Sequence, residues 1–235
     1  MITKRVIKEA FIKSIPVMAG YIILGIGFGV LLKDAGYGVL WALSMSVLIY
    51  AGALQYVGVG LIASGAGLLN VIIASIAVNA RHLFYSISMI KEYKGAGKKK
   101  PYLIFALTDE TYSLLCDGSC PEGEDKHAYR LLVSLFNQCY WVIGSVAGNL
   151  LGDVIPFDTT GIEFSMTALF LASFISQWKS TKNHIPALIG VGATVLCLLI
   201  FGTENFLIPS MFLITFLLLL MKKKLSKKEG ETDEV

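Results

Sequence analysis

Long apolar runs separated by short polar connections dominate the sequence. The runs lie at 14–32, 40–64, 67–90, 129–151, 161–177, 184–201 and 205–221, with a shorter one at 101–115. A helix needs about 20 apolar residues to cross the hydrocarbon core of a bilayer. The pattern therefore predicts an all-α integral membrane protein, a polytopic helical bundle of about 6–8 transmembrane segments surrounded by the lipid bilayer.

The polar stretches are short and leave no room for a soluble domain. Residues 1–13 are expected to form a basic interfacial helix, because their apolar and basic positions fall on opposite helix faces. Residues 14–221 are expected to form a single transmembrane domain with a basic loop at 91–100. Residues 222–235 are expected to form a charged tail.

Composition and charge support this class and orient the chain. The sequence has 235 residues, of which 55% are hydrophobic and 16% are charged, against about 25% charged in soluble domains. Lysines cluster in 91–100 and 222–228, and Lys and Arg also cluster in 1–13. The positive-inside rule places these clusters, and both termini, in the cytoplasm. The clusters have no folded face on which to sit, so no nucleic-acid partner is expected.

Two apolar segments conflict with a simple alternation of spans across the membrane. Segment 40–66 is rich in glycine, and segment 101–115 joins two loops that both appear cytoplasmic by charge. One resolution is that both are broken or re-entrant helices, which are tolerated where they are buried in protein or line a water-filled cavity. The other is about eight plain spans that break the charge rule in one loop.

Charged side chains within apolar surroundings are the candidate functional residues. The stretch "IAVNARHLFYSISM" carries Arg81 and His82, and "LIFALTDETYSLL" carries Asp109 and Glu110. A lone charge at the bilayer centre costs about 3 kcal/mol on insertion scales, so these groups are expected to be paired or to face water. Two readings remain open. They form a fixed ion pair that sets helix register, or they form an ionisable cluster on a substrate or proton path.

Uncharged hydrogen-bonding residues and one further acid extend this cluster. The complete predicted pathway is Gln55, Asn79, Arg81, His82, Thr108, Asp109, Glu110 and Glu163. No nucleotide-binding or hydrolase motif is present, and the histidines lack metal-ligand spacing, so no cofactor and no metal are expected. Adjacent acids on a helix point about 100° apart and are poorly placed to act on one bond, so the chain is not expected to be an enzyme.

A set of motifs in a fixed order resembles the AzlC family, the large subunits of bacterial branched-chain amino acid exporters. The matching stretches are "PVMAGYIILGIGFGVL", "YAGALQYVGVGLI", "VNARHLFYSIS", "LTDETYSLL" and "GIEFSMTALFL". The resemblance covers about residues 10–220. The last motif more typically carries Asp-Phe, so Glu163 departs from it by one methylene.

The resemblance implies an inner-membrane exporter of hydrophobic amino acids such as valine, leucine or isoleucine. It further implies coupling to the proton motive force and a small membrane subunit of the AzlD type as partner. A branched side chain requires an apolar, aromatic pocket, for which the sequence offers Tyr50, Tyr56, Phe84, Tyr85, Tyr112 and Phe164. The alternatives are a transporter or channel for another small organic solute, and a structural subunit without transport of its own.

Overall fold

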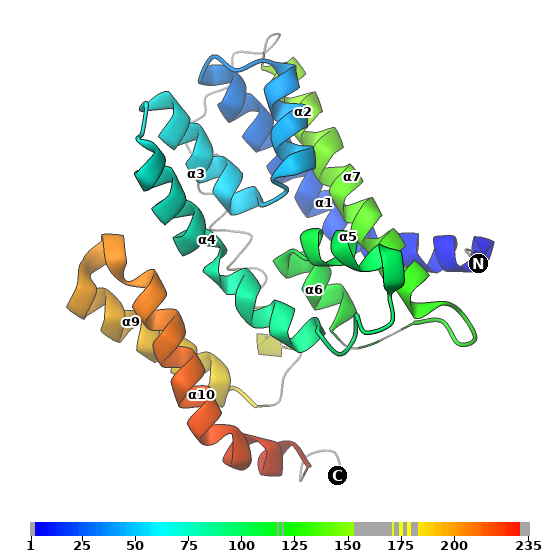
Figure 1. Cartoon of the computed structure of the whole chain (residues 1–235), viewed down its shortest axis with the longest axis vertical. Helices are drawn as coiled ribbons and strands as arrows, with labels where there is room; N and C mark the ends of the chain where they lie inside the picture. Colours follow the sequence, from blue (N-terminus) through cyan, green and yellow to red (C-terminus); the bar gives the residue numbers. More distant parts are fainter. Residues whose placement is uncertain are drawn as a thin grey trace. The chain divides into compact units, whose positions relative to one another are not determined.

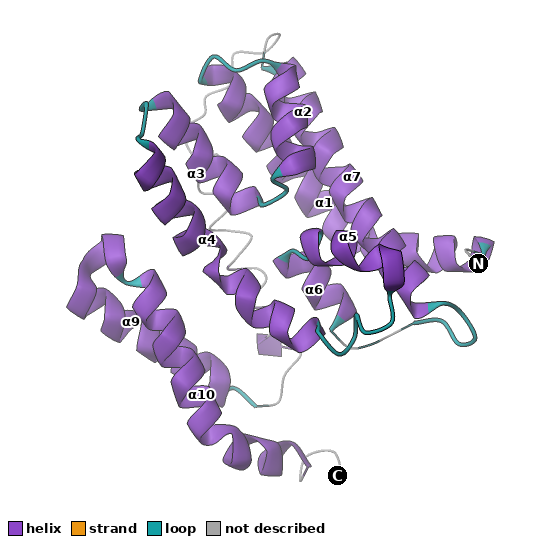
Figure 2. Ribbon diagram, in the orientation of Figure 1, coloured by secondary structure: helices purple, strands orange, loops and turns teal. Residues whose placement is uncertain are grey.

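The computed structural model describes residues 3–116, 118, 120–152, 171, 174, 175, 178, 179 and 183–230. Every element within these residues is a helix, as Figure 2 shows. The chain divides into two compact units, residues 1–169 and 170–235. The all-α fold expected from the apolar runs is confirmed.

The first unit contains seven α-helices and one short 3₁₀ turn among its described residues (Figure 1). In chain order they are α1 (Lys4–Asp34), α2 (Val39–Leu48), α3 (Gly52–Ala63), α4 (Leu68–Met89), η1 (Gly97–Lys99), α5 (Lys100–Phe105), α6 (Asp109–Leu115) and α7 (Lys126–Leu151). The basic N-terminal stretch and the first apolar run belong to one continuous helix, α1, with Pro16 in its interior.

Helices α1 and α7 pack closely and form the centre of the first unit. Their contact is lined by glycines, which let helix backbones approach one another in membrane proteins. A Cβ atom added at Gly29 would lie 2.1 Å from the Ser145 carbonyl oxygen, and one added at Gly148 would lie 2.1 Å from the Ile26 carbonyl oxygen. Nearby, the Asn149 side chain donates hydrogen bonds to the carbonyls of Gly29 and Tyr37.

The apolar segment 40–66 is broken into α2 and α3. These helices have 10 and 12 residues, or about 15 and 18 Å at 1.5 Å per residue, and each is too short to cross a bilayer. The break lies at residues 49–51, where Tyr50 has a φ of 44°. In Figure 1 the chain descends through α2 and rises again through α3. The structure thus has the broken, turned-back form of this segment.

The segment 101–115 is broken in the same way. Helix α5 ends at Phe105 and α6 begins at Asp109. Thr108 caps the start of α6, because its Oγ1 accepts a hydrogen bond from the Thr111 amide at 3.2 Å. The breaks of the two helix pairs lie close together, since the Tyr50 and Phe105 ring centroids are 6.2 Å apart.

Apolar outer faces identify the chain as an integral membrane protein. Among the described residues, three helical stretches are long and apolar enough to cross a bilayer, namely Lys4–Asp34, Lys126–Leu151 and Ile185–Gly202. Along α4, which carries the exposed residues Leu68, Leu69, Ile72, Ile73 and Ile76, large apolar side chains face outward. Such a face is stable in lipid and would favour aggregation in water.

The second unit contains the helix pair α9 (Ile185–Asn205) and α10 (Leu207–Gly230). The two helices pack against each other, and Gly202 bends the backbone of α9 with a φ of 73°. A cavity of about 550 Å³ lies within this unit and is lined by residues such as Trp178, His184 and Thr194. The Trp178 and His184 rings stack with centroids 4.0 Å apart.

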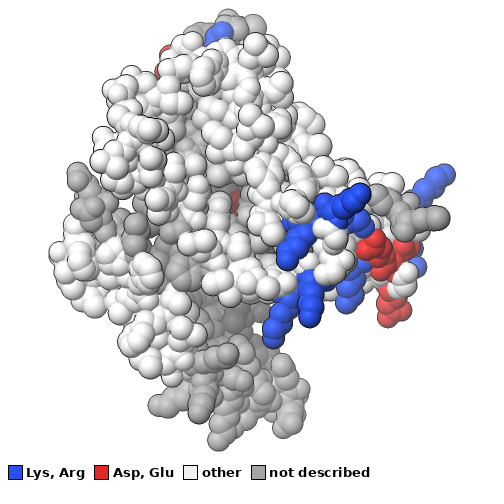
Figure 3. All heavy atoms as spheres, viewed as in Figure 1, with Lys and Arg blue, Asp and Glu red and all other residues white. Residues whose placement is uncertain are grey.

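Charged side chains of the described residues gather mainly beside the N-terminal end of α1, as Figure 3 shows. Arg130 is almost fully buried there, and it pairs with the carboxylate and the backbone carbonyl of Glu92. Asp125 accepts hydrogen bonds from the first amides of α7 and pairs with Lys99 at 2.7 Å. These contacts tie the loop after α4 to the start of α7.

Candidate functional site

The break between α5 and α6 places two adjacent acids within the first unit. Asp109 and Glu110 occupy the first turn of α6, where the helix dipole favours negative charge. The residues before them are buried, because Leu103, Ala106 and Leu107 pack into the protein core. The acids predicted to lie in apolar surroundings therefore follow a buried turn at a helix break.

Tyr21 of α1 connects Glu110 to the cap of α6. Its hydroxyl lies 2.7 Å from Glu110 Oε2 and 2.7 Å from Thr108 Oγ1. The Tyr21 side chain is 4% exposed. A hydrogen bond to a carboxylate is stronger than one between neutral groups. The pair therefore fixes the orientation of the acid relative to α1.

The same network continues from α6 to α7. Thr108 Oγ1 donates to Thr111 Oγ1 at 3.0 Å, and Asn137 Nδ2 donates to Thr111 Oγ1 at 3.0 Å. Thr111 and Asn137 are both fully buried. A continuous chain of hydrogen bonds thus runs from Glu110 through Tyr21, Thr108 and Thr111 to Asn137, and it joins three helices.

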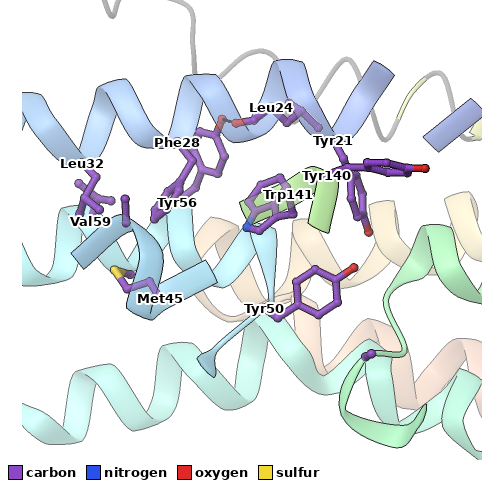
Figure 4. Close-up of a cluster of buried hydrophobic side chains, with 12 residues drawn as sticks. Tyr21, Leu24, Phe28, Leu32, Met45, Tyr50, Tyr56, Val59, Tyr140 and Trp141 are labelled. Carbon is purple, nitrogen blue, oxygen red and sulfur yellow. Dashed lines mark hydrogen bonds between the residues drawn. The ribbon is translucent and has the colours of Figure 1, made fainter. Parts of the chain in front are cut away.

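Tyr50 brings the other helix break to this network. Its side chain is buried and its hydroxyl lies beside Tyr21 and Thr111, but no hydrogen bond reaches that hydroxyl among the described residues. Figure 4 shows the hydroxyl ends of Tyr21 and Tyr50 pointing toward one another. Its positive φ is unfavourable for a side chain of this size. The backbone of the α2–α3 break is therefore held in an uncommon conformation that points this ring at the network.

Gln55 forms a separate buried bridge between α3 and α7. Its Oε1 accepts a hydrogen bond from Trp141 Nε1 at 2.9 Å, and its Nε2 lies 3.4 Å from Ser46 Oγ. The Trp141 ring in turn packs against Phe28 and Tyr21. Gln55 was predicted to belong to the pathway, and the structure places it in a bridge that cross-links helices beside the acid network.

The aromatic residues expected to line a pocket lie in two places. Tyr56 packs against Phe28 and donates to the Leu24 carbonyl at 2.7 Å. Tyr85 stacks on Tyr112 with ring centroids 5.4 Å apart and also contacts His82. Tyr56 is thus part of the packed core, whereas Tyr85, Tyr112 and His82 form a cluster between α4 and α6.

Several predicted site residues fall partly or wholly outside the described residues. The side chains of Arg81 and Phe84 lie outside them, although both positions belong to α4, and Glu163 and Phe164 lie outside them altogether. Asn79 is half-buried, and its Oδ1 has no hydrogen-bond partner among the described residues. An ion pair between Arg81 and an acid remains a prediction.

Sequence reasoning did not assign Tyr21 and Asn137 to the site. Tyr21 lies in a glycine-rich run that is typical of close helix packing, and Asn137 lies in an apolar span. One signal for the second residue was available, because Ser134 and Asn137 are three residues apart and share a face of α7. Within the described part of the chain no cluster of metal-ligating residues is present, and Cys116 and Cys120 are free thiols.

Comparison with known proteins identifies the family. Residues 16–155 match the AzlC protein family. A branched-chain amino acid transport protein AzlC from Bacillus subtilis (strain 168) is 39% identical over 94% of this chain and 87% of its own. A membrane protein of uncharacterised function from Helicobacter pylori (strain ATCC 700392 / 26695) is 43% identical over 93% of this chain and 96% of its own.

A more distant relative is the inner membrane protein YgaZ from Escherichia coli (strain K12), which is 25% identical over 77% of this chain and 76% of its own. No solved structure matches the chain. The family match and the Bacillus relative together show that the chain belongs to the AzlC family.

Proposed function

We propose that this member of the AzlC family is the large subunit of a secondary transporter that exports branched-chain or other hydrophobic amino acids. The observation that carries the proposal is the contact of Glu110 with Tyr21, which places an acid in a buried network where two broken helix pairs meet. Ionisable residues inside a membrane bundle and interrupted helices are both features of transport pathways. The Bacillus relative, a branched-chain amino acid transport protein, supports the substrate class.

A zwitterionic substrate needs partners for both of its charges. Arg81 is proposed to receive the substrate carboxylate, and the acids Asp109, Glu110 and Glu163 are the candidates for its ammonium group. Gln55, Asn79, His82 and Thr108 complete the proposed pathway. The Tyr85–Tyr112 stack, 5.4 Å between ring centroids, joins α4 to the helix that carries Asp109 and Glu110, and it offers an apolar surface for a branched side chain.

Glu110 is suited to exchange a proton during the transport cycle. When its carboxylate is ionised, the Tyr21 hydroxyl donates to it, and when it is protonated the carboxyl group donates to the Tyr21 oxygen instead. Neither state leaves the pair without a hydrogen bond. A proton taken up from one side of the membrane and released on the other would couple export to the proton motive force.

The proposed location and partner are those that the family membership supports. We place the chain in the bacterial inner membrane with both termini in the cytoplasm, on the side of the lysine clusters. A small subunit of the AzlD type is the proposed partner. The chain is proposed to act as a transporter and not as an enzyme. Transport of another small organic solute, and a structural subunit without transport of its own, are the competing functions.

Efflux from cells tests the proposal. Cells preloaded with labelled isoleucine, expressing the chain and the small subunit, are compared with and without an uncoupler. Wild type is set against Glu110→Gln, Asp109→Asn, Glu163→Gln and Arg81→Ala at equal membrane levels. We expect uncoupler-sensitive efflux that is lost in Glu110→Gln. Efflux that is unchanged by the uncoupler and persists in all four variants would mean that these charged residues form only a structural network.

A further inference from the structure

Two buried polar atoms beside the acid network have no hydrogen-bond partner among the described residues. They are the hydroxyl of Tyr50 and Oδ1 of Asn137, and their side chains are 3% and 0% exposed. Buried polar groups are almost always hydrogen-bonded, because leaving one unpaired costs free energy without return. Two such atoms in one place leave a position for a hydrogen-bonding partner that the described residues do not supply.

Both atoms lie next to Thr111. The amide nitrogen of Asn137 donates to Thr111 Oγ1 at 3.0 Å, so the oxygen of the same amide group is held close by. The Tyr50 hydroxyl lies close enough to Thr111 and Tyr21 to interact with both, although neither contact has the geometry of a hydrogen bond, and its ring is held by the contact with Phe105. The unpaired atoms therefore approach the same residue from α7 and from the α2–α3 break.

The chemistry around these atoms is that of oxygen acceptors close to a negative charge. Tyr21 of α1 and Tyr50 face the site as titratable groups, and Asp109 and Glu110 supply carboxylates from α6. From Val133 onward the buried residues of α7 are uncharged, and Arg130, two turns before Asn137, is paired with Glu92. A primary ammonium group donates three hydrogen bonds and carries a positive charge, which matches several acceptors beside a carboxylate.

We propose that the ammonium group of the transported amino acid binds between Tyr50 and Asn137, with Glu110 as its counter-charge. This inference rests on the proposed function and names the ammonium subsite within it. The φ of 44° at Tyr50 fits the same role, because strained backbone persists where a side chain must be held for function. Tyr50 and Asn137 become substrate-binding residues, and Thr111 becomes the residue that positions Asn137.

Binding of three ligands to the purified full chain in detergent tests the subsite. Leucine carries both charges, isoamylamine lacks the carboxylate, and isocaproate lacks the ammonium group. Each is titrated calorimetrically into wild type, Tyr50→Phe and Asn137→Leu in a sodium-free buffer. Both substitutions are expected to raise the Kd for leucine and for isoamylamine about tenfold, because each removes one hydrogen bond to a charged group. The Kd for isocaproate should stay unchanged.

Tyr50→Phe separates this role from a structural one. It removes a hydroxyl that makes no hydrogen bond with the described residues, so the thermal stability of the ligand-free protein should stay the same or rise slightly. Tyr140→Phe is the matched control, because it removes a buried hydroxyl that is bonded to Ser14 at 2.9 Å. That variant should lose stability while keeping the wild-type ratio of affinities for isoamylamine and isocaproate.

The outcomes distinguish this inference from the proposed function. Wild-type Kd values for leucine in both variants would overturn the subsite alone, since water would then satisfy the two atoms. Sodium is also titrated into the protein without amino acid. Binding heat in wild type that disappears in both variants would assign the site to a metal cation and overturn the ammonium subsite. Binding of isoamylamine but not leucine would support the subsite and remove amino acids as the substrate class. If wild type bound neither leucine nor isoamylamine, both the ammonium subsite and the proposed function would be overturned.

Discussion

The Tyr21 hydroxyl lies 2.7 Å from the Glu110 carboxylate and links the long first helix of the bundle to the short helix that begins at Asp109. This bond joins elements that are 89 residues apart in the sequence. It also lies where the breaks of two helix pairs meet. A change at either break is therefore expected to alter the position of the Glu110 carboxylate. Tyr21 is therefore the residue through which packing of α1 and chemistry of Glu110 are coupled.

Replacing Tyr21 by Phe should impair both folding and transport. The change leaves Thr108 and Glu110 each without one hydrogen bond in a buried site, which we expect to cost about 2 kcal/mol in the free energy of unfolding. Isoleucine efflux should fall at equal membrane levels, because Glu110 is no longer held toward α1. Unfolding in an SDS titration and efflux from preloaded cells measure the two effects.

The control for the Glu110→Gln efflux experiment changes an acid outside the network. Glu122 lies in the loop between α6 and α7, and Glu122→Gln removes the same charge as Glu110→Gln without touching the buried chain. Efflux in Glu122→Gln should equal that of wild type. If Tyr21→Phe also kept full stability and full efflux, the bond to Glu110 would have no role in either.

The bridge between Gln55 and Trp141 should appear as a coupling energy. Each single change, Gln55→Leu or Trp141→Phe, leaves a buried polar atom of the other residue unpaired, whereas the double variant removes both atoms of this bridge. The contact of Gln55 with Ser46 is lost equally in both variants that lack Gln55. We expect a coupling of about 1 kcal/mol from the double-mutant cycle, in the range found for hydrogen bonds between membrane helices. SDS titration of the four proteins gives the value, and additive losses would show that the 2.9 Å contact contributes nothing.

Much of this architecture follows from the sequence, and the physical reason is the period and length of the apolar runs. For the glycine-rich segment and the short segment with Asp109, a break was one of the two resolutions that the sequence offered, because charge alternation and run length conflicted there. The position of Glu110 within a buried network could also be anticipated, since a charge in apolar surroundings requires partners.

The identity of those partners could not be read from the sequence. Tyr21 and Asn137 are separated from Glu110 by long stretches of chain, and a tyrosine or asparagine in an apolar span has the same pattern whether it packs, cross-links or binds. Gln55 illustrates the reverse case, because its polar side chain suggested a pathway and the structure gives it a bond to Trp141. The packing of α1, α3 and α6 around α7, including the close crossing of α1 with α7, decides which of these polar groups meet.

That crossing makes Gly29 intolerant of any side chain. A methyl group there would overlap the Ser145 carbonyl oxygen at 2.1 Å, a backbone atom that can move only if α7 moves. We expect Gly29→Ala to destabilise the protein by about 3 kcal/mol, the upper part of the range for overpacked cores. Gly192→Ala on α9 is the control, since nothing lies within 4 Å of its added Cβ.

Comparing Gly29→Ala with Gly192→Ala can also contradict the close crossing of α1 with α7. Gly192→Ala should leave stability unchanged or raise it slightly, because alanine favours the helix. Equal SDS midpoints for Gly29→Ala and Gly192→Ala would mean that α1 and α7 are not in close contact in the membrane. A lower midpoint for Gly29→Ala alone supports the crossing that places Tyr21 against α6.

Asp125 gives a prediction outside the membrane. Hydrogen bonding to Lys99, followed by the amides of Ala128 and His127, lowers the pKa of this carboxyl from 3.8 to about 2. Because the pKa is lower in the folded state, the stabilisation is present above the unfolded pKa and is lost as pH falls from about 4 toward 2. Asp125→Asn keeps an oxygen for the cap and removes the charge, so it should lose less than about 1 kcal/mol.

Asp125→Ala removes the cap as well as the pair and should cost about 1 kcal/mol more than Asp125→Asn. Thermal unfolding of both variants and wild type at neutral pH, and again across the acid range, measures the two contributions. In wild type the extra stability over Asp125→Asn should vanish below the folded pKa, since a protonated Asp125 and an asparagine are then alike in charge. A difference between these two proteins that does not change with pH would show that the Lys99 pair stabilises nothing, and that the cap alone holds the start of α7.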